Sequence, residues 1–265
     1  MTVAVAVSPP RPDPHPVRRV TNRDILPGVV GRILGRLMRE PRRMRRELLK
    51  DLWIDLKRYG ATEIRNLPLA QIRGISTVSV EGAVAQPERL VVAALAKLLE
   101  CERLFEFGTF RGETTWLLAH NLPDAKVYTL DLGSADVAAR AQLELTDPEY
   151  FLDWERGTRF RGTPEERRIT QLIGDSAAVD LSPYRGNIDL VYVDASHSYS
   201  YVRSDTEAAL AMLTRFGTIV WDDYTYYSGI FAYLNELAPT LDAPIYHILG
   251  TRLAVYSRWP IVVDA

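Results

Sequence analysis

The segment LFEFGTFRGETT, residues 104–115, decides the fold of this 265-residue chain. It starts as a short apolar strand, turns at Gly108 and Gly112, and continues as a helix. Glycine lets a backbone bend tightly and approach a ligand, and the first turn of a helix offers unpaired amide donors. The Gly-x-x-x-Gly spacing differs from the Gly-x-Gly-x-x-Gly of dinucleotide sites, and the carboxylate of Glu106 disfavours a pyrophosphate. A plain strand-to-helix turn remains the structural alternative.

Short β-branched segments alternate with helical ones from about residue 87 to residue 256. We expect strands at 103–107, 126–130, 169–173, 188–193, 218–221, 245–249 and 252–256, and helices at 87–99, 114–121, 201–213 and 230–237. The alternation predicts an α/β fold with a doubly wound, Rossmann-like, mostly parallel sheet of seven strands. The link at Gly250-Thr251 is too short for a crossover, so the last strand should be antiparallel.

Composition divides the chain into three regions. Residues 1–26 form a proline-rich tail predicted to be disordered, residues 27–80 a basic amphipathic helical arm, and residues 81–265 the catalytic domain, with an insertion at 133–165. Ten arginines stand between residues 17 and 46. Packing against the catalytic domain or a second subunit, as in a homo-oligomer, is the simplest role for this arm. Anionic lipid is an alternative, and the missing base-stacking aromatics argue against nucleic acid.

The overall composition restricts the class of protein. The formal net charge is −2, and 47% of the residues are hydrophobic, as in an ordinary globular protein. One cysteine, Cys101, excludes an intramolecular disulfide and a cysteine zinc cluster. The longest apolar run, Leu90–Ala96, is too short to cross a membrane. We therefore expect a cytoplasmic protein without a membrane span.

Acidic residues follow two of the expected strands. Asp131 ends the strand at 126–130, and Asp175 with Ser176 follows the strand at 169–173. The carboxyl ends of parallel strands meet at one edge of a sheet, where ligands bind. A carboxylate at the place of Asp131 accepts hydrogen bonds from both hydroxyls of a ribose, and Asp175 would accept one from an exocyclic amine such as that of adenine. Helix capping is the alternative role for Asp131.

Three more carboxylates converge on the same edge. Asp194 ends the strand at 188–193, and Asp222 and Asp223 end the strand at 218–221. Such a group is repulsive unless some members are protonated or a cation lies among them, so we predict a magnesium site, with a capping role for at least one acid as the alternative. His197 follows closely and is predicted to be a general base or to orient the substrate; capping of the next helix is its alternative role.

These motifs resemble the class I methyltransferases that depend on S-adenosylmethionine (SAM), over about residues 87–256. The runs DASHSY (194–199), WDDY (221–224) and RFRGTP (159–164) resemble methyltransferase family 24, which is similar to macrocin-type sugar O-methyltransferases and cephalosporin-hydroxylase-like proteins. The resemblance implies that the methionine part of SAM is held by Glu106, Gly108, Thr109 and Gly112, the ribose by Asp131, the adenine by Asp175 and Ser176, and magnesium by Asp194, Asp222 and Asp223.

One position departs from those sugar enzymes. They carry a second aspartate two residues after the first metal ligand and use it as the base, whereas this chain has Ser196 there and His197 next. His197 and Asp194 are therefore the predicted catalytic residues, and the identity of the base stays open.

The resemblance implies a SAM-dependent, magnesium-assisted O-methyltransferase. Its acceptor would be a hydroxyl of a small molecule, such as a sugar or a secondary metabolite, with a proton passing to His197. One alternative is a metal-free methyltransferase that acts on a macromolecule or lipid through the basic arm. Another is a non-catalytic SAM-binding protein. An NAD-dependent oxidoreductase is disfavoured by the glycine spacing and Glu106.

Overall fold

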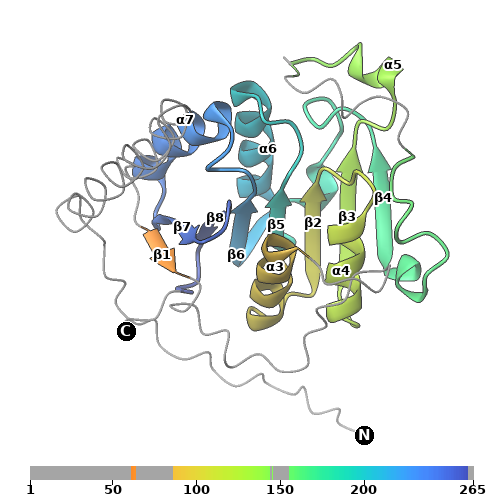
Figure 1. The fold of residues 1–265 in the computed structure, drawn as a ribbon, viewed down its shortest axis with the longest axis horizontal. Coiled ribbons are helices and arrows are strands. Elements are labelled where there is room, and N and C mark those ends of the chain that lie inside the picture. The colour runs from red at the N-terminus through yellow and green to blue at the C-terminus, as the bar shows by residue number, and fades with distance from the viewer. Residues whose placement is uncertain (1–60, 64–85, 144, 146–154, 262–265) are drawn as a thin grey trace, which may run out of the picture.

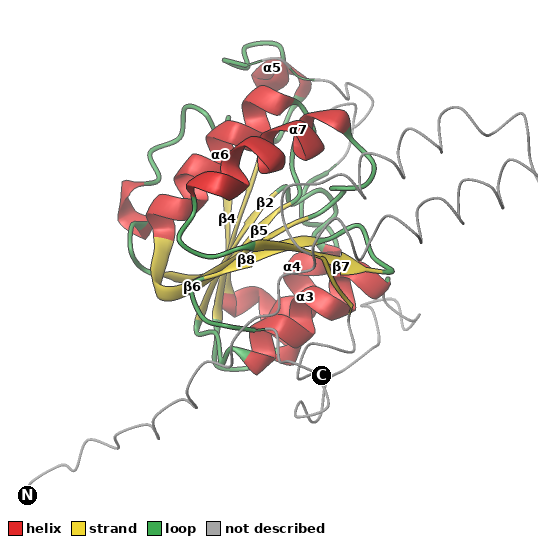
Figure 2. Cartoon of the chain, turned by 90° about the vertical axis from the view of Figure 1, so that its left-hand side faces the viewer, coloured by secondary structure: helices red, strands yellow, loops and turns green. Residues whose placement is uncertain are grey.

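The computed structural model describes residues 61–63, 86–143, 145 and 155–261. The predicted tail and nearly all of the predicted helical arm lie outside these residues, and so do any subunit contacts of the arm. Within the described residues, helices cover both faces of one sheet (Figures 1 and 2). The predicted doubly wound α/β class is confirmed. No helix of this part of the chain is both long and apolar enough to cross a membrane.

The sheet has eight strands in the order β1-β7-β8-β6-β5-β2-β3-β4. The strands are β1 (Ala61–Glu63), β2 (Arg103–Phe107), β3 (Lys126–Asp131), β4 (Ile169–Ile173), β5 (Ile188–Val193), β6 (Leu213–Trp221), β7 (Ile245–Leu249) and β8 (Ala254–Ser257). β8 is antiparallel to β6 and β7, and the other described pairs are parallel. The seven predicted strands and the antiparallel last strand are confirmed. β1 adds a short eighth strand beside β7.

Helices pack on both faces because the central strands are apolar on both. The helices are α3 (Pro87–Leu98), α4 (Glu113–Asn121), α5 (Ala135–Ala138), α6 (Tyr199–Met212) and α7 (Ser228–Leu237), with 3-10 turns η4 (Pro164–Arg168), η5 (Ser182–Tyr184) and η6 (Ala238–Thr240). α3 and α4 share one core with the sheet, around Leu95 and Leu117. α6 and α7 share the other, around Val202 and Leu234 (Figure 2). Continuous burial of this kind is typical of parallel strands.

Two elements begin earlier than their apolar patterns predict. α6 begins at Tyr199 because Ser198 caps it, its hydroxyl accepting a hydrogen bond from the Tyr201 amide at 3.2 Å. β6 begins at Leu213, which pairs with Ile188 across an irregular register. In both cases a local hydrogen bond or a strand partner extends the element beyond its apolar run.

Candidate active site

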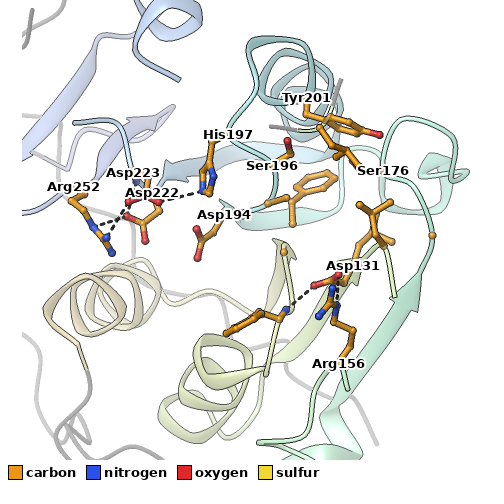
Figure 3. Close-up of a pocket in the computed structure, with 18 of the residues that line it drawn as sticks. Asp131, Arg156, Ser176, Asp194, Ser196, His197, Tyr201, Asp222, Asp223 and Arg252 are labelled. Atoms are coloured by element: carbon orange, nitrogen blue, oxygen red, sulfur yellow. Dashed lines mark hydrogen bonds and ion pairs between the residues drawn. The ribbon is translucent and has the colours of Figure 1, made fainter. Parts of the chain in front are cut away.

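One pocket opens at the carboxyl ends of β2, β3, β5 and β6, where ligands bind in this class of fold. Its lining includes Arg89, Gly108, Asp131, Arg156, Ser176, Asp194, His197, Tyr201, Asp222, Asp223 and Arg252. In Figure 3 these residues form two groups. Asp131 and Arg156 lie at one end, and Asp222, Asp223 and Arg252 at the other, with Asp194 and His197 between them. The sequence motifs therefore converge on one cavity.

The glycine turn after β2 packs directly on the end of β5. Gly108 has φ +96°, and a Cβ there would lie 1.9 Å from the carbonyl oxygen of Asp194. Gly112 has φ +83°, and its Cβ would lie 2.5 Å from the ring of Phe160. Both positions thus need glycine. Gly108 lines the pocket, whereas Gly112 faces Phe160, and the hydroxyl of the buried Thr109 is 2.6 Å from that of Thr129.

Glu106 lies beneath the pocket instead of in its lining. Its side chain is 1% exposed and accepts hydrogen bonds from the hydroxyls of Thr115 and Thr129. Burial raises the pKa of Glu106 to about 8, because the charged form is poorly solvated there. In this structure Glu106 therefore links β2 to α4 and β3, and the predicted contact with the methionine part of SAM stays a prediction.

The end of the pocket predicted to hold the ribose centres on Asp131. Its carboxylate accepts hydrogen bonds from the Phe110 amide and from Nε of Arg156, both at 2.7 Å (Figure 3). These donors fix the carboxylate while it faces the pocket. Arg156 belongs to the insertion after β3, and no motif in the sequence marks it.

The predicted adenine residues divide between the pocket and the protein interior. Ser176 lines the pocket, together with Tyr201 of α6. Asp175 is buried, and it accepts hydrogen bonds from the Tyr201 hydroxyl at 2.9 Å and from the Gln142 amide at 2.8 Å. Asp175 thus anchors α6 and the insertion, and its predicted contact with adenine stays a prediction.

The three predicted metal ligands do lie together, but their environments differ. Burial and the charges of Asp222 and Asp223 raise the pKa of Asp194 well above its usual value. Asp222 accepts hydrogen bonds from the Tyr192 hydroxyl at 2.7 Å and from the Asp223 amide at 2.6 Å. These bonds orient its carboxylate, which still lines the pocket, and its predicted contact with magnesium stays a prediction.

His197 lies close to two of the three predicted metal ligands, Asp194 and Asp223. Within the described residues, ligand atoms of Asp194, His197 and Asp223 lie within 4.8 Å of one another. Nε2 of His197 is 3.2 Å from Oδ2 of Asp223, and its ring stacks on Tyr227 with centroids 3.9 Å apart. Two carboxylates and an imidazole suit a divalent ion, so these three residues, the candidate metal group, fit a metal.

Arg252, which sequence reasoning missed, closes this end of the pocket. It precedes β8, and its Nη1 lies 3.1 Å from Oδ1 of Asp223. Its Nε lies 3.7 Å from Oδ1 of Asp222 and 3.7 Å from Oε1 of Glu88 on α3. The antiparallel pairing of β8 with β6 was the available signal, because it brings the start of β8 beside the aspartates that end β6.

Residues 105–224 match the model of a family described as a methyltransferase domain. The resemblance to methyltransferase family 24 is therefore confirmed over this segment, which is 120 of the 265 residues. The sequence matches none of the curated proteins with which it was compared.

Solved structures similar to this chain are distant in sequence. The O-methyltransferase TomG from Streptomyces achromogenes is 19% identical, over 69% of this chain and 82% of that chain, with a TM-score of 0.47. A putative O-methyltransferase from Klebsiella pneumoniae is 18% identical, over 76% and 89%, with a TM-score of 0.47. A putative caffeoyl-CoA O-methyltransferase from Staphylococcus aureus is 12% identical, over 66% and 84%, with a TM-score of 0.50. This last likeness supports the fold alone.

Three charged residues at the pocket lie outside the matched segment. Glu88 and Arg89 belong to α3, and Arg252 to the turn before β8. Arg89 and Arg252 line the pocket, and Glu88 contacts Arg252.

Proposed function

We propose that the protein transfers the methyl group of SAM to a hydroxyl oxygen of a small molecule. The observation that carries this proposal is the pairing of His197 with Asp223, at 3.2 Å, in the same pocket as Asp131. A hydroxyl becomes a better nucleophile when a positioned base removes its proton. Such a transfer needs a base at one end of the pocket and, at the other end, a carboxylate that accepts hydrogen bonds from the ribose of SAM.

The ribose and adenine of SAM would lie at the end formed by Asp131, Ser176 and Tyr201. The amide of Phe110 and the guanidinium of Arg156 hold the Asp131 carboxylate, so it is oriented before the ligand arrives. The methionine part would then extend past Gly108 towards Asp194, since both line the same cavity. This orientation directs the methyl group towards His197.

The chain's main tasks are to align the acceptor and to receive its proton. The acceptor oxygen attacks the methyl carbon in line with the departing sulfur, and positioning alone supplies several kcal/mol of barrier reduction. Nε2 of His197 lies 3.2 Å from Oδ2 of Asp223, and Tyr227 stacks on the ring, so the imidazole is held in one orientation. We propose that Nδ1 of His197 receives the proton.

A magnesium ion fits the same end of the pocket. Asp194 and Asp223 would hold it, with His197 in reach as a third ligand. Bound there, the ion would lower the pKa of the acceptor hydroxyl. Support comes from Asp194, because the loss of solvation and the nearby charges of Asp222 and Asp223 raise the pKa of its carboxyl group.

Calorimetry with SAM, with NAD as the control ligand, tests the cofactor half of the proposal. Saturable binding of SAM alone is expected, and a response to NAD alone would contradict it. Turnover with hydroxylated acceptors, measured with magnesium and then with chelator, tests the rest. Asp223→Asn should lower turnover about 100-fold and leave SAM affinity unchanged. Asp124→Asn, an exposed acid before β3 at the opposite edge of the sheet, is the matched control.

His197→Gln separates a base from a metal ligand. Loss of turnover that excess magnesium does not restore identifies a base, whereas restoration identifies a ligand. Deleting residues 1–60 addresses the rival acceptor, a macromolecule or lipid bound through the basic arm. An enzyme that methylates a small molecule keeps its turnover after this deletion. If both the full chain and the shortened chain bind SAM but neither turns it over, the protein is non-catalytic.

A further inference from the structure

The guanidinium of Arg252 lies among carboxylates from three parts of the fold. It is 3.1 Å from Asp223 and 3.7 Å from Asp222, at the end of β6, and 3.7 Å from Glu88 on α3. Asp194, at the end of β5, adds a further acid beside the same cluster (Figure 3). Arg252 is 34% exposed, whereas its carboxylate partners are 7–15% exposed, so it reaches from the rim into the acidic end of the pocket.

Arg252 and His197 of the candidate metal group both contact the carboxylate of Asp223, but each contacts a different oxygen. Arg252 contacts Oδ1 of Asp223, while Oδ2 faces His197. Asp223 itself has φ +54°, a left-handed backbone conformation that favours glycine. Its amide donates to Oδ1 of Asp222, which Arg252 also approaches. Arg252 therefore holds Asp223 with one oxygen turned towards the metal group.

Arg252 and a divalent ion would compete for the negative charge of the same carboxylates. Three carboxylates packed together attract a cation strongly, and each positive charge already present weakens that attraction. The guanidinium carries a permanent positive charge, because arginine does not lose its proton in proteins. It therefore offsets part of the negative potential that a divalent ion would otherwise use.

We propose that Arg252 is a resident cation that weakens divalent-ion binding at the Asp194, His197 and Asp223 group, and so sets how strongly methyl transfer depends on metal. This inference rests on the acidic end of the pocket described under the proposed function. It assigns to Arg252, which lies outside the matched methyltransferase segment, control over the metal requirement of that segment.

Binding of Mn²⁺ to the full chain tests the proposal without any turnover assay. Mn²⁺ is titrated into the wild type, Arg252→Gln and Arg252→Lys, and free ion is followed by electron paramagnetic resonance. Arg252→Gln should bind Mn²⁺ about tenfold more tightly than the wild type, since a positive charge beside the site is gone. Arg252→Lys keeps the charge and should stay within about threefold of the wild type.

Two further variants keep the result interpretable. Arg203→Gln removes the same charge from the exposed face of α6, where Arg203 pairs with Glu207, and should leave Mn²⁺ affinity unchanged. Arg252→Met is a second neutral variant of similar length, for use if the glutamine variant does not fold. Circular dichroism and SAM calorimetry check that each variant is native.

The outcomes distinguish this inference from the proposed function. Equal Mn²⁺ affinity in the wild type and both neutral variants overturns the inference, and so does a lack of binding in all of them. Methyl transfer is judged separately, by turnover of SAM with an acceptor. Tight binding in the neutral variants with weak binding in the wild type and in Arg252→Lys supports the inference.

Discussion

Replacing Glu106 by glutamine should make the protein more stable at alkaline pH. Burial raises the pKa of Glu106 from 4.5 to about 8, a difference of about 3.5. At 1.36 kcal/mol for each pKa unit, the ionised carboxylate costs the folded state about 5 kcal/mol. The sign follows from the direction of the shift. Below pH 4.5 the group is neutral in both states and costs nothing; as pH rises towards 8, the unfolded state ionises first and stability is lost.

Glutamine keeps the shape of the side chain and a carbonyl that can accept from Thr115 and Thr129. Urea unfolding of wild type and Glu106→Gln at pH 5, 7 and 9 measures the effect. At pH 5 we expect the free energies of unfolding of the wild type and Glu106→Gln to agree within about 1 kcal/mol. At pH 9 we expect the variant to be more stable than the wild type by about 3–5 kcal/mol. Glu155→Gln, at a side chain 79% exposed, should show no such dependence. A Glu106→Gln difference that does not change with pH would refute the reasoning.

Three other substitutions probe the same structure. Asp205→Asn should be more stable than the wild type by a margin that grows from pH 3.8 to about 7 and is about 4 kcal/mol in urea unfolding at pH 9, because burial raises the pKa of Asp205 from 3.8 to about 7. Gly108→Ala should lose SAM binding in calorimetry and about 2 kcal/mol or more of stability, because its Cβ would lie 1.9 Å from the Asp194 carbonyl oxygen. Asp131→Ala should weaken SAM binding about tenfold or more, because it removes a ribose acceptor and leaves the buried Arg156 without its carboxylate. If Asp131→Ala left the SAM affinity unchanged, the ribose of SAM would not bind at the end of β3.

Strands buried on both faces were the part of the fold most accessible from sequence. The expected strands at 188–193 and 245–249 match β5 and β7 to the residue, because apolar β-branched runs between polar turns mark such strands. β1 was not predicted, because three residues are too few to show a pattern. Its place depends on pairing with β7, which is far away in the chain.

The residues at the strand ends correctly predicted where the pocket lies. Which of their side-chain atoms face the pocket is decided by packing. Asp131 and Ser176 line the pocket as their positions suggest. Glu106 and Asp175 sit at equally suggestive positions, yet each accepts hydrogen bonds from neighbouring elements. Hydroxyls and amides from residues well separated in the chain make those bonds, and no single-sequence pattern reports them.

The acidic end of the pocket illustrates the same limit more sharply. Adjacent aspartates at the end of β6 looked equivalent as metal ligands, but the chain bends at Asp223, with φ +54°, and sends the two side chains in different directions. Asp222 turns towards Tyr192, and Asp223 towards His197 and Arg252. The left-handed backbone of Asp223 thus places one carboxylate in contact with both His197 of the candidate metal group and Arg252. A substitution that relaxes that backbone, Asp223→Gly, would remove both cation contacts at once, so Arg252 variants are the cleaner way to separate the two cations.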